Sequence, residues 1–231
     1  MDLCLLSGGA AFGLVSHIRK DFEARNHCCI TGEFGAVGMM KDKLLAGEAC
    51  DVIILSRKLI DQLARDARVI RESIRDLGVV STGTAVIEGE APPVITDEVS
   101  LAKALLAASG VYVPDMSKST AGIHMKNVFE RLQVFDRIKE RIQEFPNGAT
   151  AMKAMASKAA PHSLGCTQLT EIMATSGVTV VAALPKSCAL DTVYTVAIPS
   201  ASGQVDLAGV LIDGLCDASL DKFKRDNGFS K

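Results

Sequence analysis

Short strand-like segments alternate with longer helical ones along the chain, and this order constrains the fold more than any other feature. Apolar runs at 3–6, 28–31 and 51–55 have the length and composition of buried strands. Between them, apolar residues recur at helical spacing over 14–22 and 39–45. Because parallel strands need a long crossover connection, this order predicts an α/β fold with a mostly parallel sheet and helices on both faces.

A second strand-and-helix series follows the first. Extended segments are expected at 79–80, 84–87, 111–113, 164–167, 178–184 and 193–199, and helices near 99–106, 134–144, 150–158 and 205–216. The first two of these segments flank Ser81-Thr82-Gly83, and the chain is expected to cross between two α/β units near 81–86 and 190–195. We therefore predict two lobes, residues 1–83 with 193–231 and residues 84–192, each a mostly parallel sheet flanked by helices.

The charge balance and the aromatic content exclude two classes of partner. The 231 residues include 25 Lys and Arg against 27 Asp and Glu, a formal net charge of -2, whereas nucleic-acid-binding domains carry a basic excess. There is no Trp and there are only two Tyr, so few rings could stack on bases or sugars. No apolar run approaches the ~18 residues that a membrane-spanning helix needs. We therefore expect a small polar or anionic ligand, no nucleic-acid partner and no membrane insertion.

The N-terminus and the cysteines indicate the cellular compartment in which the protein is expected. Met1–Leu6 has no basic segment, long apolar stretch or cleavage site, which are the parts of an export signal. The seven cysteines include no C-x-x-C pair, and the adjacent Cys28 and Cys29 should point to opposite faces of a strand. This pattern is typical of free thiols in a reducing compartment. The sequence as it stands predicts a cytoplasmic protein, or a periplasmic one if a signal peptide has been removed, with no cofactor and no metal site.

Glycine-rich turns precede several of the expected helices. They are Ser7-Gly8-Gly9-Ala10, Gly35-Ala36-Val37-Gly38, Ser119-Thr120-Ala121-Gly122 and Gly148-Ala149-Thr150. The first turn of a helix leaves backbone N–H groups unpaired at the positive end of the helix dipole, and small residues let an oxyanion come close. Such turns at the carboxyl ends of strands predict an anion site. The first turn does not match the dinucleotide motif G-x-G-x-x-G, because Ala10 occupies the third position of the motif.

At these turns the sequence resembles the molybdate-binding branch of the type II periplasmic solute-binding proteins. The resemblance is carried along the chain by Ser7 to Ala11, Phe34 to Gly38, Leu44 to Val52, Pro114 to His124, Leu164 to Gln168 and Lys222 to Phe229. The segment Gly47-Glu48-Ala49-Cys50-Asp51-Val52 is the most specific of these. The resemblance implies a two-lobed "Venus flytrap" that holds an anion between its lobes with hydroxyls and backbone amides. It also implies an ABC transporter membrane component as a partner if the protein is exported.

The resemblance further implies a set of ligand-binding positions on both lobes. They are Ser7, Gly8, Gly9, Ala10, Ala36, Val37, Gly38, Ser119, Thr120, Ala121, Thr150 and Gln168. Ala10, the Ala36–Gly38 segment and Gln168 stand where the family has a Ser, a Ser cluster and a Tyr, whereas Ala121 and Thr150 keep backbone-amide positions. Oxyanion oxygens left unpaired in a dry site are costly, so these changes disfavour molybdate. We expect another oxyanion, or a di- or tricarboxylate.

A second function, isomerisation, stays open beside anion binding. Similar scaffolds include aconitate isomerase, which moves a double bond by proton transfer, and that reaction needs charged anchors and a positioned base. The candidate anchors are Arg57 and Lys118, and the candidate catalytic residues are His124, Cys166 and Tyr194, with His162 in the same part of the chain. No G-x-S-x-G, H-E-x-x-H or C-x-x-C motif is present, which disfavours hydrolase and metalloenzyme classes. The two alternatives are a solute-binding protein and a cytoplasmic isomerase of unsaturated polycarboxylates.

Overall fold

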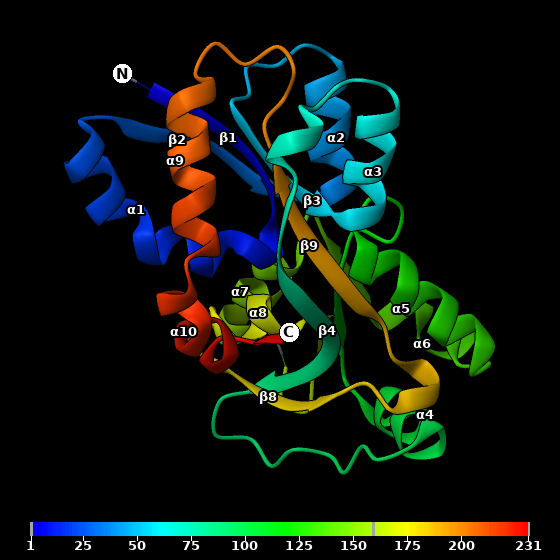
Figure 1. Ribbon diagram of the computed structural model, residues 1–231. Coiled ribbons are helices and arrows are strands. Elements are labelled where there is room, and N and C mark those ends of the chain that lie inside the picture. Colours follow the sequence, from blue (N-terminus) through cyan, green and yellow to red (C-terminus); the bar gives the residue numbers. More distant parts are fainter. Residues whose placement is uncertain (1, 159, 231) are drawn as a thin grey trace. The chain divides into compact units, whose positions relative to one another are not determined.

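The computed structural model describes residues 2–158 and 160–230, and its internal contacts divide the chain into two units. The first unit consists of Met1–Val79 and Thr192–Lys231, and the second of Val80–Asp191. The chain therefore leaves the first unit once and returns to it once (Figure 1).

The sheet of the first unit is centred on parallel strands. These are β1 (Asp2–Gly8), β2 (Cys29–Gly35) and β3 (Val52–Ser56), in the order β2-β1-β3. Next to β3 lies the antiparallel strand β9 (Asp191–Ala197), followed by β4 (Arg75–Ile87), which also pairs with the short β10 (Phe229–Ser230). All five residues of β3 are buried, as expected for a strand covered by helices on both faces.

Helices cover both faces of this sheet. On one face α1 (Phe12–Asn26) packs against α9 (Val205–Cys216), and on the other lie α2 (Val37–Leu45) and α3 (Arg57–Arg65) (Figure 1). The helix α10 (Asp221–Asp226) follows α9, and its Phe223 ring stacks on His17 of α1 with ring centroids 3.8 Å apart. Short 3-10 helices at Gly9–Ala11, Arg71–Ser73 and Ala218–Leu220 complete the unit.

The second unit repeats this plan with a mixed sheet. Strand β5 (Val111–Pro114) lies between β6 (Ile142–Phe145) and β7 (Leu164–Gln168), all parallel, and the second half of β4 runs antiparallel to β7 and to β8 (Val178–Ala183). The helices are α4 (Glu98–Ala107), α5 (Thr120–Arg131), α6 (Phe135–Ile138), α7 (Gly148–Lys158) and α8 (Leu169–Met173), with 3-10 turns at Lys139–Arg141 and Lys186–Cys188. The predicted α/β fold class is confirmed in both units.

Two predicted elements differ from the structure. The extended segments expected at 79–80 and 84–87 are parts of one strand, β4, which runs through Ser81-Thr82-Gly83 and has 13 residues. A Cβ at Gly83 would lie 2.4 Å from Leu169 Cδ2 and 2.7 Å from the carbonyl oxygen of Ala182, so the glycine serves close packing within the sheet. The helix expected near 134–144 is only α6, because Ile142–Phe145 pairs with β5 as an edge strand instead.

The thiols behave as the cysteine pattern predicts. All seven cysteines are free, Cys28 is buried and the adjacent Cys29 is exposed. Cys50, Cys166 and Cys188 are also buried. The Cys50 thiol donates to the carbonyl oxygen of Val52 at 3.2 Å, and Cys188 Sγ accepts from Arg131 at 2.8 Å.

The start of α5 depends on a close approach between backbone segments. The Ser119 side chain caps the helix by accepting a hydrogen bond from the Gly122 amide at 3.5 Å. A Cβ on Gly122 would lie 2.1 Å from the carbonyl oxygen of Asp115 and 2.5 Å from that of Pro114. Any side chain here would push the first turn of α5 away from the end of β5.

We expect Gly122→Ala to destabilise the fold by about 1–3 kcal/mol, because the added methyl group has no room against rigid backbone. Gly209→Ala in α9 is the matched control, since a Cβ there meets nothing within 4 Å. That control should be neutral or stabilising by up to ~1 kcal/mol, because alanine favours helix over glycine. Urea unfolding of the two variants measures the difference, and equal stabilities would contradict the packing argument.

Candidate functional site

Three helix N-termini meet at one edge of the first unit's sheet. β1, β2 and β3 are parallel neighbours, with Gly8 opposite Gly35 and Ser7 opposite Ile54, so their carboxyl ends share an edge. The helices α2 and α3 begin directly after β2 and β3, whereas the 3-10 helix Gly9–Ala11 links β1 to α1. No described side chain caps the N-termini of these helices. Uncapped amides at the positive ends of helix dipoles make this edge suited to an anion.

The side chains at this edge are small and mostly apolar. Ser7, Gly9, Ala10, Ala36 and Val37 are buried, and the Ser7 hydroxyl donates to the carbonyl oxygen of Gly8 at 2.9 Å. Because that hydroxyl donates to the chain's own backbone, it is not free to donate to a ligand.

Tyr194 joins this edge from β9. It pairs with Ser56, the residue before α3, and a Cβ on Gly8 would lie 2.9 Å from its Cε1 atom and 2.7 Å from Val37 Cγ1. The structure therefore brings Gly8, Val37 and Tyr194 together, although they are far apart in sequence. Gly38, in the first turn of α2, is half-buried.

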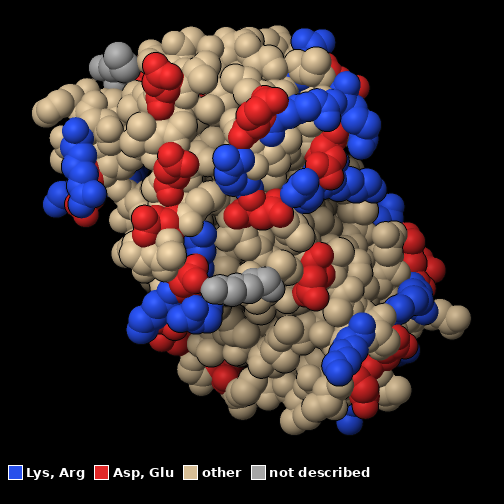
Figure 2. Space-filling view, viewed as in Figure 1, with Lys and Arg blue, Asp and Glu red and all other residues tan. Residues whose placement is uncertain are grey.

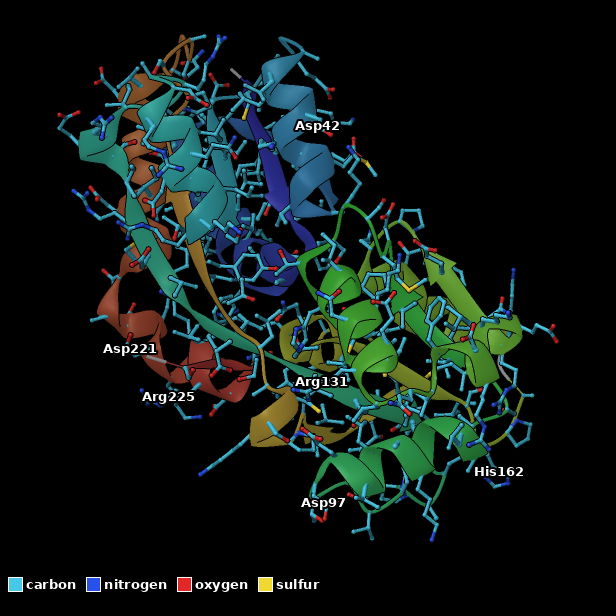
Figure 3. All side chains as sticks on the ribbon, turned by 90° about the vertical axis from the view of Figure 1, so that its right-hand side faces the viewer. Asp42, Asp97, Arg131, His162, Asp221 and Arg225 are labelled. Carbon is cyan, nitrogen blue, oxygen red and sulfur yellow. The ribbon has the colours of Figure 1, made fainter. Side chains whose placement is uncertain are left out.

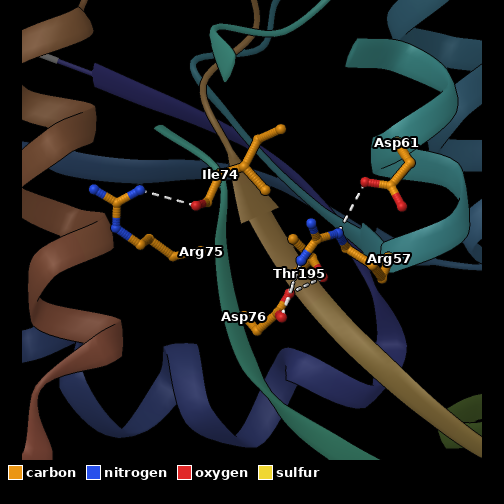
Figure 4. A network of polar contacts seen from close by, with 6 residues as sticks. All are labelled: Arg57, Asp61, Ile74, Arg75, Asp76 and Thr195. Atoms are coloured by element: carbon orange, nitrogen blue, oxygen red, sulfur yellow. Dashed lines mark hydrogen bonds and ion pairs between the residues drawn. The ribbon is translucent and has the colours of Figure 1, made fainter. Parts of the chain in front are cut away.

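Arg57 is held by two carboxylates that the sequence analysis did not foresee. Its Nε donates to Asp61 Oδ1 at 2.8 Å, and its Nη1 donates to both carboxylate oxygens of Asp76 at 3.1 and 3.0 Å (Figure 4). Asp76 also accepts from the Thr195 hydroxyl at 2.7 Å. Asp61 and Asp76 raise the pKa of Arg57 further and neutralise its charge, so its predicted role as a ligand anchor is not supported.

In the second unit, the N-terminus of α5 presents unpaired amides. One Asp115 carboxylate oxygen accepts from the amides of Ser117 and Lys118 and from the Ser117 hydroxyl, each at 2.7 Å. This fixes the loop before the Ser119 cap. Among the residues that the structure describes, the amides of Thr120 and Ala121 have no acceptor, so two of the predicted donors remain available.

The N-terminus of α7 is filled by a carboxylate of the chain itself. Glu171 of α8 is buried and accepts from the Thr167 hydroxyl at 2.6 Å and from the backbone amides of Ala149, Gln168 and Gly148. Gly148 makes this possible, because a Cβ there would lie 2.0 Å from both Glu171 Oε2 and Thr167 Oγ1. The Gly148 and Ala149 amides at this turn therefore already have an acceptor from within the chain.

Two predicted ligand positions are consequently corrected. The Thr150 amide and hydroxyl both donate to Asn147 Oδ1, at 2.8 and 3.0 Å, so Asn147 caps α7. The Gln168 amide is bound to Glu171, and its side chain is buried. Sequence reasoning missed Glu171 because a glutamate in the first turn of a helix ordinarily faces solvent.

The remaining catalytic candidates do not form a cluster. Cys166 is fully buried in the core, and burial raises the pKa of its thiol to about 12, so the structure contradicts a catalytic role for it. His124 Nε2 lies 2.8 Å from the carbonyl oxygen of Cys188, a contact that ties α5 to the 3-10 turn Lys186–Cys188. The exposed His162 lies at one edge of this unit, away from Arg131 of α5 (Figure 3).

We expect Glu171→Gln to change how stability depends on pH. Burial, opposed in part by the hydrogen bonds to Thr167 and the three amides, raises the pKa of Glu171 above its ordinary value of 4.5. The folded chain then holds a proton that the unfolded chain has already lost, so wild-type stability should fall relative to Glu171→Gln as pH rises above 4.5. Urea unfolding between about pH 4 and 8 measures this difference.

The matched control is Glu140→Gln, which changes an exposed carboxylate in the same unit. It should follow the wild type at every pH. A constant difference between wild type and Glu171→Gln across the range would contradict the pH linkage.

Two features are absent from residues 2–158 and 160–230. No group of three or more His, Cys, Asp or Glu side chains is placed to hold a metal ion. No helix there is long and apolar enough to cross a membrane.

Comparison with known proteins places this geometry in a family. Residues 3–230 match the family described as bacterial extracellular solute-binding protein. An aconitate isomerase from Pseudomonas sp is 25% identical over 237 residues, covering 98% of this chain and 86% of that protein.

Solved structures agree with the fold. The periplasmic molybdate-binding protein of Azotobacter vinelandii superimposes with a TM-score of 0.80 at 16% identity, covering 99% of both chains. The sulfate-binding protein SubI of Mycobacterium tuberculosis gives a TM-score of 0.76 at 16% identity, covering 99% of this chain and 86% of that one. The two-lobed α/β fold is thus the one found in periplasmic anion-binding proteins. Since the family match spans nearly every residue, the chain belongs to the bacterial extracellular solute-binding proteins, as its resemblance to the type II, molybdate-binding-like branch predicts.

Proposed function

We propose that this protein binds a small anion, either an oxyanion or a di- or tricarboxylate. The observation that carries the proposal is the set of uncapped helix N-termini at the ends of β1, β2 and β3, together with the unpaired Thr120 and Ala121 amides of α5. Anions bind at such termini because the amides and the helix dipole act together. The family match supports the same function.

The donors of the proposed site are mostly backbone amides. The Ser7 hydroxyl donates to the carbonyl oxygen of Gly8. The side chains of Ala10, Ala36 and Val37 have no hydrogen-bond donor. A compact tetrahedral oxyanion needs donors on every oxygen once it is desolvated, and each unpaired oxygen is costly. A carboxylate ligand spreads its oxygens over a longer molecule and leaves apolar carbon for the apolar side chains. We therefore favour a di- or tricarboxylate over molybdate.

The proposed role is delivery of this anion to a membrane transporter. One structural relative is described as the substrate-binding domain of a putative molybdenum ABC transporter from Clostridium difficile. By this proposal the protein acts outside the cytoplasmic membrane, and its partner is the membrane component of an ABC transporter.

A ligand screen by thermal unfolding tests the proposal. A ligand that binds only the folded state raises the free energy of unfolding by about 2.7 kcal/mol at a hundredfold excess over its Kd. We expect small di- or tricarboxylates to raise the melting temperature more than molybdate or sulfate at equal concentration. No stabilisation by any of these anions would overturn the proposal.

Replacing one backbone amide tests the role of α5. Thr120 is the first residue of the helix, and Ser119 has φ -88° and ψ 136°, the conformation required before a proline. Thr120→Pro should therefore remove one amide donor without breaking the helix, and it should weaken binding of the anion found in the screen about tenfold. Thr120→Ala keeps the amide and removes the hydroxyl, so its affinity should stay within about twofold of wild type. Equal affinities of the two variants, measured by calorimetry, would exclude this amide as a donor.

A second candidate function is isomerisation of an unsaturated polycarboxylate. It is favoured by the 25% identity to an aconitate isomerase over 98% of this chain. With Cys166 in the core and His124 held against a backbone carbonyl, Tyr194 beside Gly8 is the best-placed candidate to move a proton.

Ultraviolet absorbance of cis- and trans-aconitate incubated with the protein tests this alternative. If the protein is an isomerase, Tyr194→Phe should slow interconversion by at least ~10²-fold while ligand binding persists, because a general base acts mainly on the transition state. Absence of interconversion by the wild type at high protein concentration would rule out this reaction.

A further inference from the structure

The first unit has a hollow beside α3 that the proposed function does not use. It has a volume of about 440 Å³ and is lined by Arg57, Asp61, Ala64, Arg65, Arg71 and Ile74. Arg57, Asp61 and Arg65 are four residues apart along α3, so they lie on one face of that helix. Arg71 comes from the 3-10 turn Arg71–Ser73 that faces it across the hollow.

Positive charge in this hollow exceeds negative charge. Three guanidinium groups line it, but Asp61 and Asp76 pair with Arg57, so the uncompensated positive charge lies on Arg65 and Arg71. Lys and Arg side chains also gather over α3 and the segment after it (Figure 2). Within the described part of the chain, Arg65 and Arg71 form neither an ion pair nor a side-chain hydrogen bond.

The third guanidinium is held in place. Asp61 binds the Nε of Arg57 and Asp76 binds its Nη1, so this side chain is fixed while part of its guanidinium edge has no carboxylate on it (Figure 4). Fixing one donor group before a ligand arrives reduces the entropy lost on binding. Arg65 and Arg71 are exposed and free to close on a ligand.

We propose that this hollow is a second anion site, which binds a phosphate group carrying two or more negative charges. Guanidinium groups match phosphate oxygens in pairs of parallel hydrogen bonds, and several arginines in one pocket favour a multiply charged ligand over a single carboxylate. The site differs from the proposed ligand site in its donors, which are side chains along the length of α3 rather than amides at helix starts. All of its residues belong to the first unit.

Titration with pyrophosphate, followed by NMR of the arginine Nε–H groups, tests the proposal on the full chain. Arg65→Gln and Arg71→Gln each remove one signal and so assign it. In the wild type we expect the Arg65 and Arg71 signals to shift together and saturate at one midpoint. The double variant should bind pyrophosphate at least ~10-fold more weakly, since hydrogen bonds to charged groups are worth that much or more.

Lys58→Gln is the matched control, because it removes a charge from α3 outside the hollow. Its affinity should stay within about twofold of wild type. The proposal would be overturned if the control and the double variant lost the same affinity for pyrophosphate, or if the Arg65 and Arg71 signals did not shift. Tighter binding of a hexaglutamate peptide than of pyrophosphate would also overturn it. The last would indicate a docking surface for an acidic protein segment.

Discussion

The backbone amides at helix N-termini impose the constraint on which the rest of this structure depends. Every helix leaves such groups at its start, and each must find an acceptor in protein, solvent or ligand. Because β1, β2 and β3 are parallel neighbours, the chain delivers three helix starts to one edge of the sheet. The second unit delivers the starts of α5 and α7 in the same way, after the parallel strands β5 and β6.

The chain satisfies these amides in different ways. At α7, Asn147 and Glu171 supply oxygens from within the protein, and Gly148 leaves room for the carboxylate. At α5, Ser119 caps one amide and leaves two others without a partner in the described structure. At α1, α2 and α3 of the first unit, no described side chain caps the helix. The termini without internal acceptors are therefore the ones suited to an external anion, which is the basis of the proposed function.

The cationic side chains of α3 differ in whether a carboxylate pairs with them. Arg57 begins α3 at the strand edge, but Asp61 and Asp76 hold it. The uncompensated positive charge lies farther along α3, at Arg65 and Arg71. The first unit thus separates an edge with neutral amides at its helix starts from a hollow with charged donors, which is why we propose different anions for the two.

The sequence by itself determined the alternation of strands and helices, the glycine-rich turns and the family resemblance, because these depend on local spacing and on short motifs. Tertiary structure decided at which of these turns the backbone amides remain without an acceptor from the chain. Thr150 and Gln168 match the family positions, yet Asn147 and Glu171 occupy their amides, and the carboxylate of Glu171 reaches the start of α7 from another helix. Tertiary packing also placed Gly83 inside a strand and Cys166 in the core. The physical reason is the same in each case: a residue's neighbours across the sheet decide whether its polar groups and its space are already taken, and spacing along the chain does not specify those neighbours.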